Sequence, residues 1–430
     1  MNYVSSEKVE RLREAFWKED EKAGGIIKKQ YDEIKRVLSE KDREWVEERL
    51  LDIKRHAIEN TKYYESYSID DVFPIMTKSI LIEHYNECKA KKGFTGPIHT
   101  STTSGSTGVP FSVEQDFIKR KRTIADLKVL GELCNYPSHE RMILFRVLSK
   151  KLNRTPEQEE RENIFYVDSS RLDDERLEEM YQIILEKKPR IIFSYASTLV
   201  SLATYIRKKH PDSTYTELKS VLTAGEGISE ENRQMLSKVF NCEVYRRYAD
   251  MELGILAQDM GDGGAYSLNW GSYYFECLKM DRDEPTENGE IGRIVITDLF
   301  NYAFPMIRDD TGDLGVMEYP ADDFPKLKEI HGRVRDCVYS TDGRIISPAK
   351  ISVSMWGEDR IKQWQFIQNT ANGYVLKLNA DSDGNYTAIV NTLKEVLGKN
   401  ASIDIEFVDD IPVLSSNKRR AVICNYTKDR

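Results

Sequence analysis

A run of glycines and small hydroxyl residues near residue 100 is the part of the sequence best suited to hold phosphate groups. It reads TSTTSGSTGVP over residues 100–110. Its candidate phosphate contacts are Thr103, Ser104, Gly105, Ser106, Thr107 and Gly108. Glycine lets backbone N–H groups turn towards an anion, and hydroxyl groups donate further hydrogen bonds. The spacing fits neither GxxxxGK[ST] nor GxGxxG, and a flexible polar linker has a similar composition.

Further downstream, short segments carry charged or aromatic residues that could complete such a site. These segments contain Gly225 and Glu226, Tyr248 and Glu252, Asp313, Arg333 and Arg335, and Lys418. Taken singly, each has an ordinary structural explanation. Glu226 fits a solvated loop acid, Asp313 an Asp-Gly turn region, and Lys418 a solvated basic turn. Their order along the chain therefore carries more information than their types.

The run TTSGSTGVP resembles the phosphate-binding loop of the adenylate-forming superfamily, which includes acyl-CoA ligases and peptide synthetase adenylation domains. The segments AGE, YADMELG, IRDDTGDLG, HGRVRD and SSNKRR follow in the order of that family. The resemblance implies a carboxylic acid substrate, ATP and Mg²⁺, with CoA as a possible co-substrate. The lead-in FPIMTK and the short length resemble the phenylacetate-CoA ligase and CapK-like branch.

The resemblance also implies a role for each candidate residue. Lys418 and Glu252 would be catalytic, and Glu252 and Thr107 would lie at the metal. Gly225, Glu226 and Tyr248 would contact adenine, Asp313 the ribose hydroxyls, and Arg333 the nucleotide. Ser194, Tyr195 and Ala196 would line the acid pocket, and Arg335 would be the hinge.

The chain departs from the family pattern at a few positions. Val109 replaces a loop lysine, Ala249 replaces a glycine, and Asn417 replaces the glycine before the catalytic lysine. A catalytically weakened nucleotide-binding scaffold of the same fold therefore stays open. The stretch from Leu256 to Met260 supplies no thiols for the zinc that some relatives carry, so we expect no zinc.

The pattern of elements indicates how these segments are positioned. Between about 140 and 300, β-rich runs such as MILFRVL, RIIFSYA, KSVLTAGE and CEVYRRYA alternate with helical runs. This alternation is typical of an α/β layer in which ligands bind beyond the carboxyl ends of the strands. We expect a large N-terminal multi-layer α/β domain over 1–334, whose β-sheets are flanked by helices, and a small mobile C-terminal α+β lid domain over 335–430.

Composition narrows the classes of partner. The 430 residues carry a formal charge of −9 without a basic block, so nucleic acid is not expected as a partner. No membrane span and no secretion signal are expected, which favours a cytoplasmic protein, either a monomer or a homodimer. The six cysteines and six histidines are dispersed and suggest neither disulfides nor a metal site.

The acyl acceptor stays open at this stage. A thiol of CoA or of a carrier protein is the family default. An amine, such as that of an amino sugar in capsule or polysaccharide synthesis, is the alternative for a CapK-like enzyme.

Overall fold

The structure is a computed structural model. It describes residues 6–102, 111–147, 154–213, 215, 217–261, 264–333, 337–346, 350–351, 354–355, 360–361, 363–411 and 421–426. Its helices are α1 Glu7–Lys22, α2 Ile26–Glu40, α3 Arg43–Asn60, α4 Lys78–Glu83, α5 Tyr85–Cys88, α6 Phe117–Glu132, α7 Pro156–Glu162, α8 Asp174–Lys187, α9 Ala196–Lys209, α10 Glu230–Phe240 and α12 Thr387–Leu397.

The strands form one large sheet, one small sheet and two short pairs. They are β1 His99–Thr102, β2 Ser112–Gln115, β3 Met142–Arg146, β4 Ile164–Asp168, β5 Ile191–Ser194, β6 Ser220–Ala224, β7 Glu243–Ala249, β8 Ile255–Asp259, β9 Tyr266–Leu268, β10 Tyr273–Leu278, β11 Ile291–Asp298, β12 Asp309–Glu318, β13 Lys326–Arg333, β14 Val338–Tyr339, β15 Ile345–Ile346, β16 Gln363–Gln368, β17 Gly373–Asn379, β18 Ser402–Phe407 and β19 Val422–Cys424.

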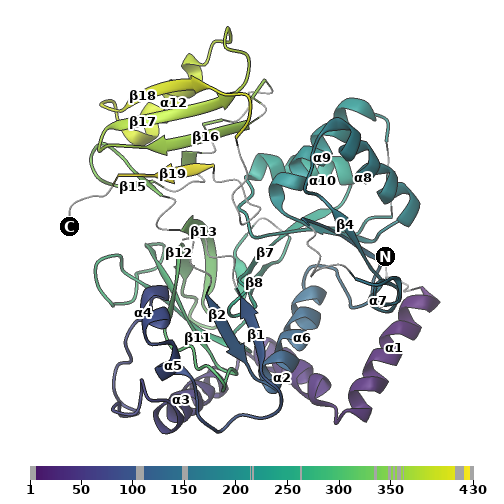
Figure 1. Ribbon diagram of the computed structural model, residues 1–430, viewed down its shortest axis with the longest axis vertical. Helices are drawn as coiled ribbons and strands as arrows, with labels where there is room; N and C mark the ends of the chain where they lie inside the picture. The colour runs from purple at the N-terminus through teal and green to yellow at the C-terminus, as the bar shows by residue number, and fades with distance from the viewer. Residues whose placement is uncertain are drawn as a thin grey trace.

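The large sheet has the strand order β10-β11-β12-β13-β9-β8-β7-β6-β5-β3-β4. Strands β3 to β7 run parallel to their neighbours, whereas β7 to β13 pair antiparallel. Helices α8, α9 and α10 lie together beside the parallel half in Figure 1. Apolar residues at helical spacing, such as Leu199, Leu202 and Ile206 of α9, join one core with the parallel strands.

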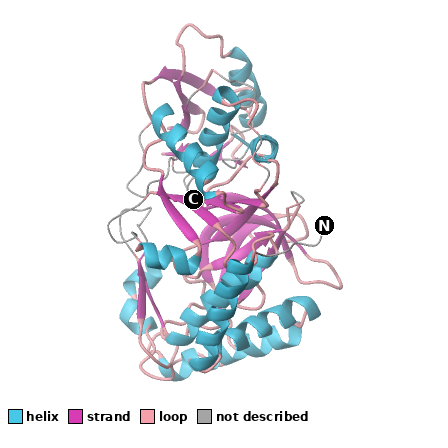
Figure 2. Ribbon diagram, turned by 90° about the vertical axis from the view of Figure 1, so that its right-hand side faces the viewer, coloured by secondary structure: helices cyan, strands magenta, loops and turns pink. Residues whose placement is uncertain are grey.

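The small sheet near the C-terminus has the order β18-β17-β16-β19 and lies at the top of Figure 1 in yellow and light green. Ile389, Leu393 and Leu397 of α12 share a separate core with this sheet. Figure 2 shows the large sheet with helices gathered around it. The predicted fold class, a large α/β part with flanking helices and a small C-terminal α+β part, is confirmed. The boundary at 334/335 falls outside the described residues and stays a prediction.

Helix α6 carries charged side chains that are completely buried. The Lys119 ammonium lies 2.5 Å from a carboxylate oxygen of Asp298, and neither side chain is exposed. Arg122 donates to Glu33 of α2 over 2.5 Å and to Ser272 over 2.9 Å. Since an unpaired buried charge is costly, these contacts fix α6 against the sheet. This buried network was not predicted from the sequence.

No helix in the described part of the chain is long and apolar enough to cross a membrane.

Candidate functional site

Three of the predicted segments follow neighbouring parallel strands. Ser194 at the end of β5 pairs in register with Thr223 of β6, and Ala224 at the end of β6 pairs with Arg247 of β7. Because carboxyl ends of parallel strands meet at one edge, the segments after β5, β6 and β7 lie beside one another. The outer two of these segments, which follow β5 and β7, are more than 50 residues apart in the sequence, and their role in ligand binding stays a prediction.

Glu226 is held by the start of the neighbouring helix α9. Its Oε2 accepts a hydrogen bond of 2.9 Å from the backbone N–H of Ser197. The carboxylate thus satisfies an N–H group in the first turn of a helix, where negative charge is favoured. Gly225 before it has a φ of 76°, a conformation that glycine adopts without strain.

The residues predicted to bind the acid differ in accessibility. Ser194 and Ala196 are 3% and 4% exposed, and the Ser194 hydroxyl donates to the carbonyl of Phe145 over 3.0 Å. Tyr195 is half-buried at the N-terminus of α9. Among these three residues, Tyr195 therefore presents the most surface to a substrate, and its role stays a prediction.

Tyr248 and Asp313 are joined directly although 65 residues separate them. The Tyr248 hydroxyl donates to Oδ2 of Asp313 over 2.8 Å. Burial raises the pKa of Tyr248 well above its usual value, and the neighbouring Asp313 charge adds to this effect. The phenol therefore remains a hydrogen-bond donor and fixes the carboxylate that was predicted to bind ribose. Asp313 also lies opposite Arg333 in the β12–β13 register.

The backbone around Glu252 is held from several sides. The Ser101 hydroxyl donates to the Met251 carbonyl over 2.7 Å, and the Gln115 amide donates to the Glu252 carbonyl over 3.1 Å. The Tyr273 hydroxyl donates to the carbonyl of Leu253 over 2.6 Å. Ser101 and Gln115 belong to β1 and β2, the strands that flank the Gly/Ser/Thr run. The base of that run therefore lies against the Glu252 segment.

Glu252 lies within a group of carboxyl groups that includes Asp250 and Asp309. Burial raises the pKa of Asp250, and the charges of Glu252 and Asp313 raise it further. The pKa of Asp309 is raised well above its usual value by burial, then by Asp250 and Glu252. This point of the structure therefore has a strongly negative field, which favours a bound cation.

A lysine that the sequence had not suggested faces this group. The Lys78 ammonium lies 3.6 Å from Oε1 of Glu252 and 5.7 Å from the centre of the Phe111 ring. Phe111 is the residue that directly follows the Gly/Ser/Thr run. The segment before Lys78 reaches this place because Met76 forms a parallel bridge to Asp309 at the start of β12. In the sequence, FPIMTK indicated only a resemblance to a family and gave no role to Lys78. A bridge between residues as distant as Met76 and Asp309 leaves no pattern in the local sequence.

Several predicted residues cannot be placed. Thr103 to Gly108, Arg335 and Lys418 lie outside the described residues, as does the side chain of Arg333. What is described is the frame of the loop, where Thr102 pairs with Ser112 and their hydroxyl oxygens are 2.9 Å apart. Among the described residues, no group of three or more histidine, cysteine or acidic side chains is arranged to hold a metal by itself.

Two comparisons with known sequences concern the CapK-like part of the resemblance. The family described as the CapK C-terminal domain matches residues 338–425. Protein CapK of Staphylococcus aureus is 24% identical over 274 residues, which cover 61% of this chain. The alignment spans 59% of the length of CapK.

Solved structures extend the comparison to nearly the whole chain. A 2-hydroxyisobutyryl-CoA ligase in the postadenylation state, in complex with R3-HIB-AMP, has a TM-score of 0.71 at 16% identity, covering 91% of this chain and 90% of its own. The same ligase with 2-HIB-AMP and CoA in the thioesterification state gives 0.57 at 18% identity, covering 90% of both chains. ATP-bound MatB from Rhodopseudomonas palustris gives 0.56 at 16% identity, covering 75% of this chain and 66% of its own.

The chain thus has the fold of adenylate-forming CoA ligases, and its C-terminal part resembles that of CapK. Both resemblances noted from the sequence are confirmed.

Proposed function

We propose that this chain is an AMP-forming ligase that activates a carboxylic acid with Mg-ATP as an acyl adenylate. One observation carries the proposal: Ser101, at the base of the Gly/Ser/Thr run, bonds to the segment that holds Glu252, at the strand edge where Tyr248 bonds to Asp313. The residues proposed for the metal and the ribose would thereby lie near the base of the run proposed for the phosphates. The shared fold with CoA ligases that bind acyl-AMP and ATP supports the same reaction.

The residues near the carboxyl ends of β5, β6 and β7 have side chains that could bind the separate groups of ATP. Asp313 can accept hydrogen bonds from both ribose hydroxyls, and Tyr248 keeps its carboxylate oriented. Gly225 and Glu226 directly follow β6, which pairs with the strand β7 that carries Tyr248, and they would lie along adenine. Backbone N–H groups and hydroxyl groups of Thr103 to Gly108 would bind the phosphates.

A magnesium ion would fit at Glu252. Magnesium prefers hard oxygen ligands and usually combines one or two carboxylates with substrate phosphates, so a cage built of protein groups alone is unnecessary. The raised pKa values of Asp250 and Asp309 reflect burial and an excess of negative charge that a cation would offset. Glu252, with Thr107 of the loop, would hold the ion, whose contribution is to neutralise charge on the phosphates.

The reaction requires positioning and charge stabilisation more than covalent chemistry by the protein. An oxygen of the substrate carboxylate attacks the α-phosphorus of ATP, the bond to the β-phosphate oxygen breaks, and pyrophosphate leaves. Lys418 would stabilise the charge that develops at the α-phosphate. Lys78, which lies 3.6 Å from Glu252, would supply a further cation near the phosphates, where Val109 replaces the usual loop lysine.

The second step would transfer the acyl group to a thiol. The sulfur of CoA or of a carrier protein attacks the carbonyl carbon of the adenylate, and AMP leaves. A C-terminal lid over 335–430, swinging about Arg335, would first withdraw Lys418. The different TM-scores against two states of one CoA ligase, 0.71 and 0.57, support a fold of this kind with more than one domain arrangement. An amine, such as that of an amino sugar, is the alternative acceptor.

Pyrophosphate exchange tests the first step. The chain is incubated with Mg-ATP, labelled pyrophosphate and single acids from an aromatic, an aliphatic and an amino acid set, and acyl adenylate is trapped with hydroxylamine. We expect exchange with at least one acid and formation of its hydroxamate. Nucleotide binding without any hydroxamate would instead identify a scaffold that has lost the reaction. CoA and amino sugars are then added separately to identify the acceptor.

A further inference from the structure

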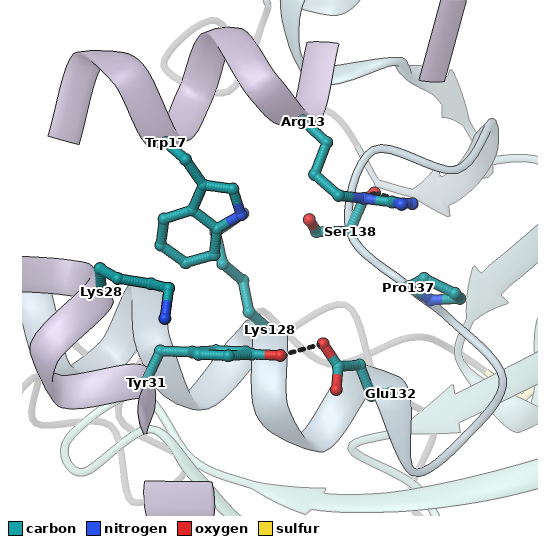
Figure 3. Close-up of a pocket in the computed structure, with 8 residues that line it drawn as sticks. All are labelled: Arg13, Trp17, Lys28, Tyr31, Lys128, Glu132, Pro137 and Ser138. Carbon is teal, nitrogen blue, oxygen red and sulfur yellow. Dashed lines mark hydrogen bonds between the residues drawn. The ribbon is translucent and has the colours of Figure 1, made fainter. Parts of the chain in front are cut away.

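A small cavity lies away from the strand edge, between α1, α2 and α6. It has a volume of about 250 Å³ and is lined by Arg13, Trp17, Lys28, Tyr31, Lys128, Glu132, Pro137 and Ser138. Figure 3 shows Arg13 and Trp17 descending from α1, Lys28 and Tyr31 coming from α2, and Lys128 and Glu132 rising from α6. Three of its eight lining residues are cations and one is an acid.

Lys128 is the unusual member of this set. It is 9% exposed, and its ammonium makes no hydrogen bond or ion pair with the part of the chain that the structure describes. The ammonium instead lies 3.6 Å from the ring centre of Phe16 and 5.4 Å from that of Trp17. Aromatic faces compensate a buried ammonium only in part. Burial of such a cation without a carboxylate is costly unless an anion completes the site.

The charged groups around Lys128 do not compensate the burial of its ammonium. Burial lowers the pKa of Lys128 to about 8, and Arg13 lowers it further, against the opposite effect of Glu132 and Asp20. Burial, then the charges of Lys128 and Arg13, lower the pKa of His139 to about 4, so that this ring is neutral near pH 7.

The neighbouring side chains do not neutralise the cavity either. Glu132 is engaged by the Tyr31 hydroxyl and by Lys35, whose ammonium lies 2.9 Å away. Arg13 donates to the Ser138 carbonyl over 3.1 Å and has a carboxylate, that of Glu140, only at 3.9 Å. Lys28 pairs with Asp32, and both of these side chains are more than half exposed, so solvent screens the pair.

We propose that this cavity binds a small oxyanion, a phosphate or carboxylate group, between the Lys128 ammonium, Arg13 and Lys28. The volume lies below the roughly 300–1,000 Å³ of pockets for drug-sized ligands, so the ligand is a small anion and not a nucleotide. Trp17 and Pro137 line the cavity as well and offer flat surfaces to a compact apolar body attached to the anion. The site is independent of the strand edge and of the proposed ligase reaction.

Calorimetric titration without ATP tests this site with two probes, inorganic phosphate and acetate, at constant ionic strength set with chloride. The unaltered chain is compared with Lys128→Met, which removes the charge and keeps an unbranched side chain of nearly the same length. A second comparison uses Lys29→Met, since Lys29 is an exposed residue of α2 that does not line the cavity. Lys28→Gln serves as a second variant, since this side chain is 52% exposed and its replacement leaves the core intact.

We expect one of the probes to bind the unaltered chain. Lys128→Met should weaken that binding roughly tenfold to a hundredfold, the usual effect of losing a hydrogen bond to a charged group. Lys28→Gln should weaken it less, and Lys29→Met should leave it unchanged. If neither probe binds, or if binding is equal in Lys128→Met and the unaltered chain, the inference is wrong and Lys128 only clamps α1 onto α6. Binding at the nucleotide site alone would also give this equal result.

Discussion

The most informative perturbation is Glu252→Gln, which keeps the size of the side chain and removes its charge. The Glu252 carboxylate lies 3.6 Å from the Lys78 ammonium and raises the pKa values of Asp250 and Asp309. Its removal therefore loses one favourable interaction and relieves two unfavourable ones. If the carboxylate also holds the metal of ATP, activity should suffer far more than folding does.

The expected sizes follow from the same geometry. Two unit charges at 3.6 Å interact by about 4–5 kcal/mol at an effective dielectric constant of 20. The side chains of Lys78 and Glu252 are 33% and 19% exposed, so solvent screening reduces the net value of the pair to about 1 kcal/mol. Relief of repulsion with Asp250 and Asp309 offsets part of that loss. We therefore expect the free energy of unfolding to change by less than about 1 kcal/mol. Adenylation should fall roughly 100- to 1,000-fold, as on removal of a preorganised electrostatic group.

The assay combines pyrophosphate exchange at increasing Mg²⁺ with urea unfolding. Glu114→Gln is the matched control, because Glu114 is 23% exposed and pairs with Lys89 over 2.5 Å. We expect this control to keep its exchange rate. Exchange by Glu252→Gln within threefold of the unaltered chain at saturating Mg²⁺ would refute the assignment. A fall in exchange matched by loss of folded protein would assign Glu252 a structural role instead.

Three further variants test separate parts of the structure. Tyr248→Phe removes the donor that holds Asp313, so the KM for ATP should rise about tenfold with little change in kcat, as steady-state kinetics would reveal. Lys418→Ala should reduce adenylation at least a hundredfold while a supplied acyl adenylate is still transferred to its acceptor, which stopped-flow assays of each step can separate. Asp42→Ala removes the N-cap of α3 and should cost about 1 kcal/mol in urea unfolding. Arg36 and the Trp45 N–H hold the pKa of Asp42 below its usual value, so its stabilisation is present above that value and is lost as pH falls, a dependence that the alanine variant should lack.

The alternating part of the chain was predictable because its signals are local. Helical runs were expected between the β-rich runs, and one of them is observed as α8 Asp174–Lys187. The run KSVLTAGE, residues 219–226, was expected to be a strand and contains β6 Ser220–Ala224. A strand of five buried or nearly buried residues between two amphipathic helices leaves little choice of fold class. Chain order and parallel pairing then bring Glu226 and Tyr248 to one edge.

The cations that support the site were not predictable in the same way. Lys78 reaches Glu252 through a bridge between Met76 and Asp309, segments that are more than 230 residues apart. Lys119 reads as a surface residue in sequence because its burial depends on Asp298, which lies in a distant strand. Such pairings depend on three-dimensional contact, for which a single sequence holds no local pattern.

The buried charges of α6 also limit how this chain can change over evolutionary time. Exchange of Lys119 for an apolar residue would strand the Asp298 carboxylate, and exchange of Asp298 would strand the ammonium, because neither side chain reaches water. A substitution at one of these two positions is therefore expected to destabilise the protein unless the other position changes as well. Relatives should therefore carry either both charges or a matched apolar pair, because a chain with only one of the two charges would hold α6 less firmly against the large sheet.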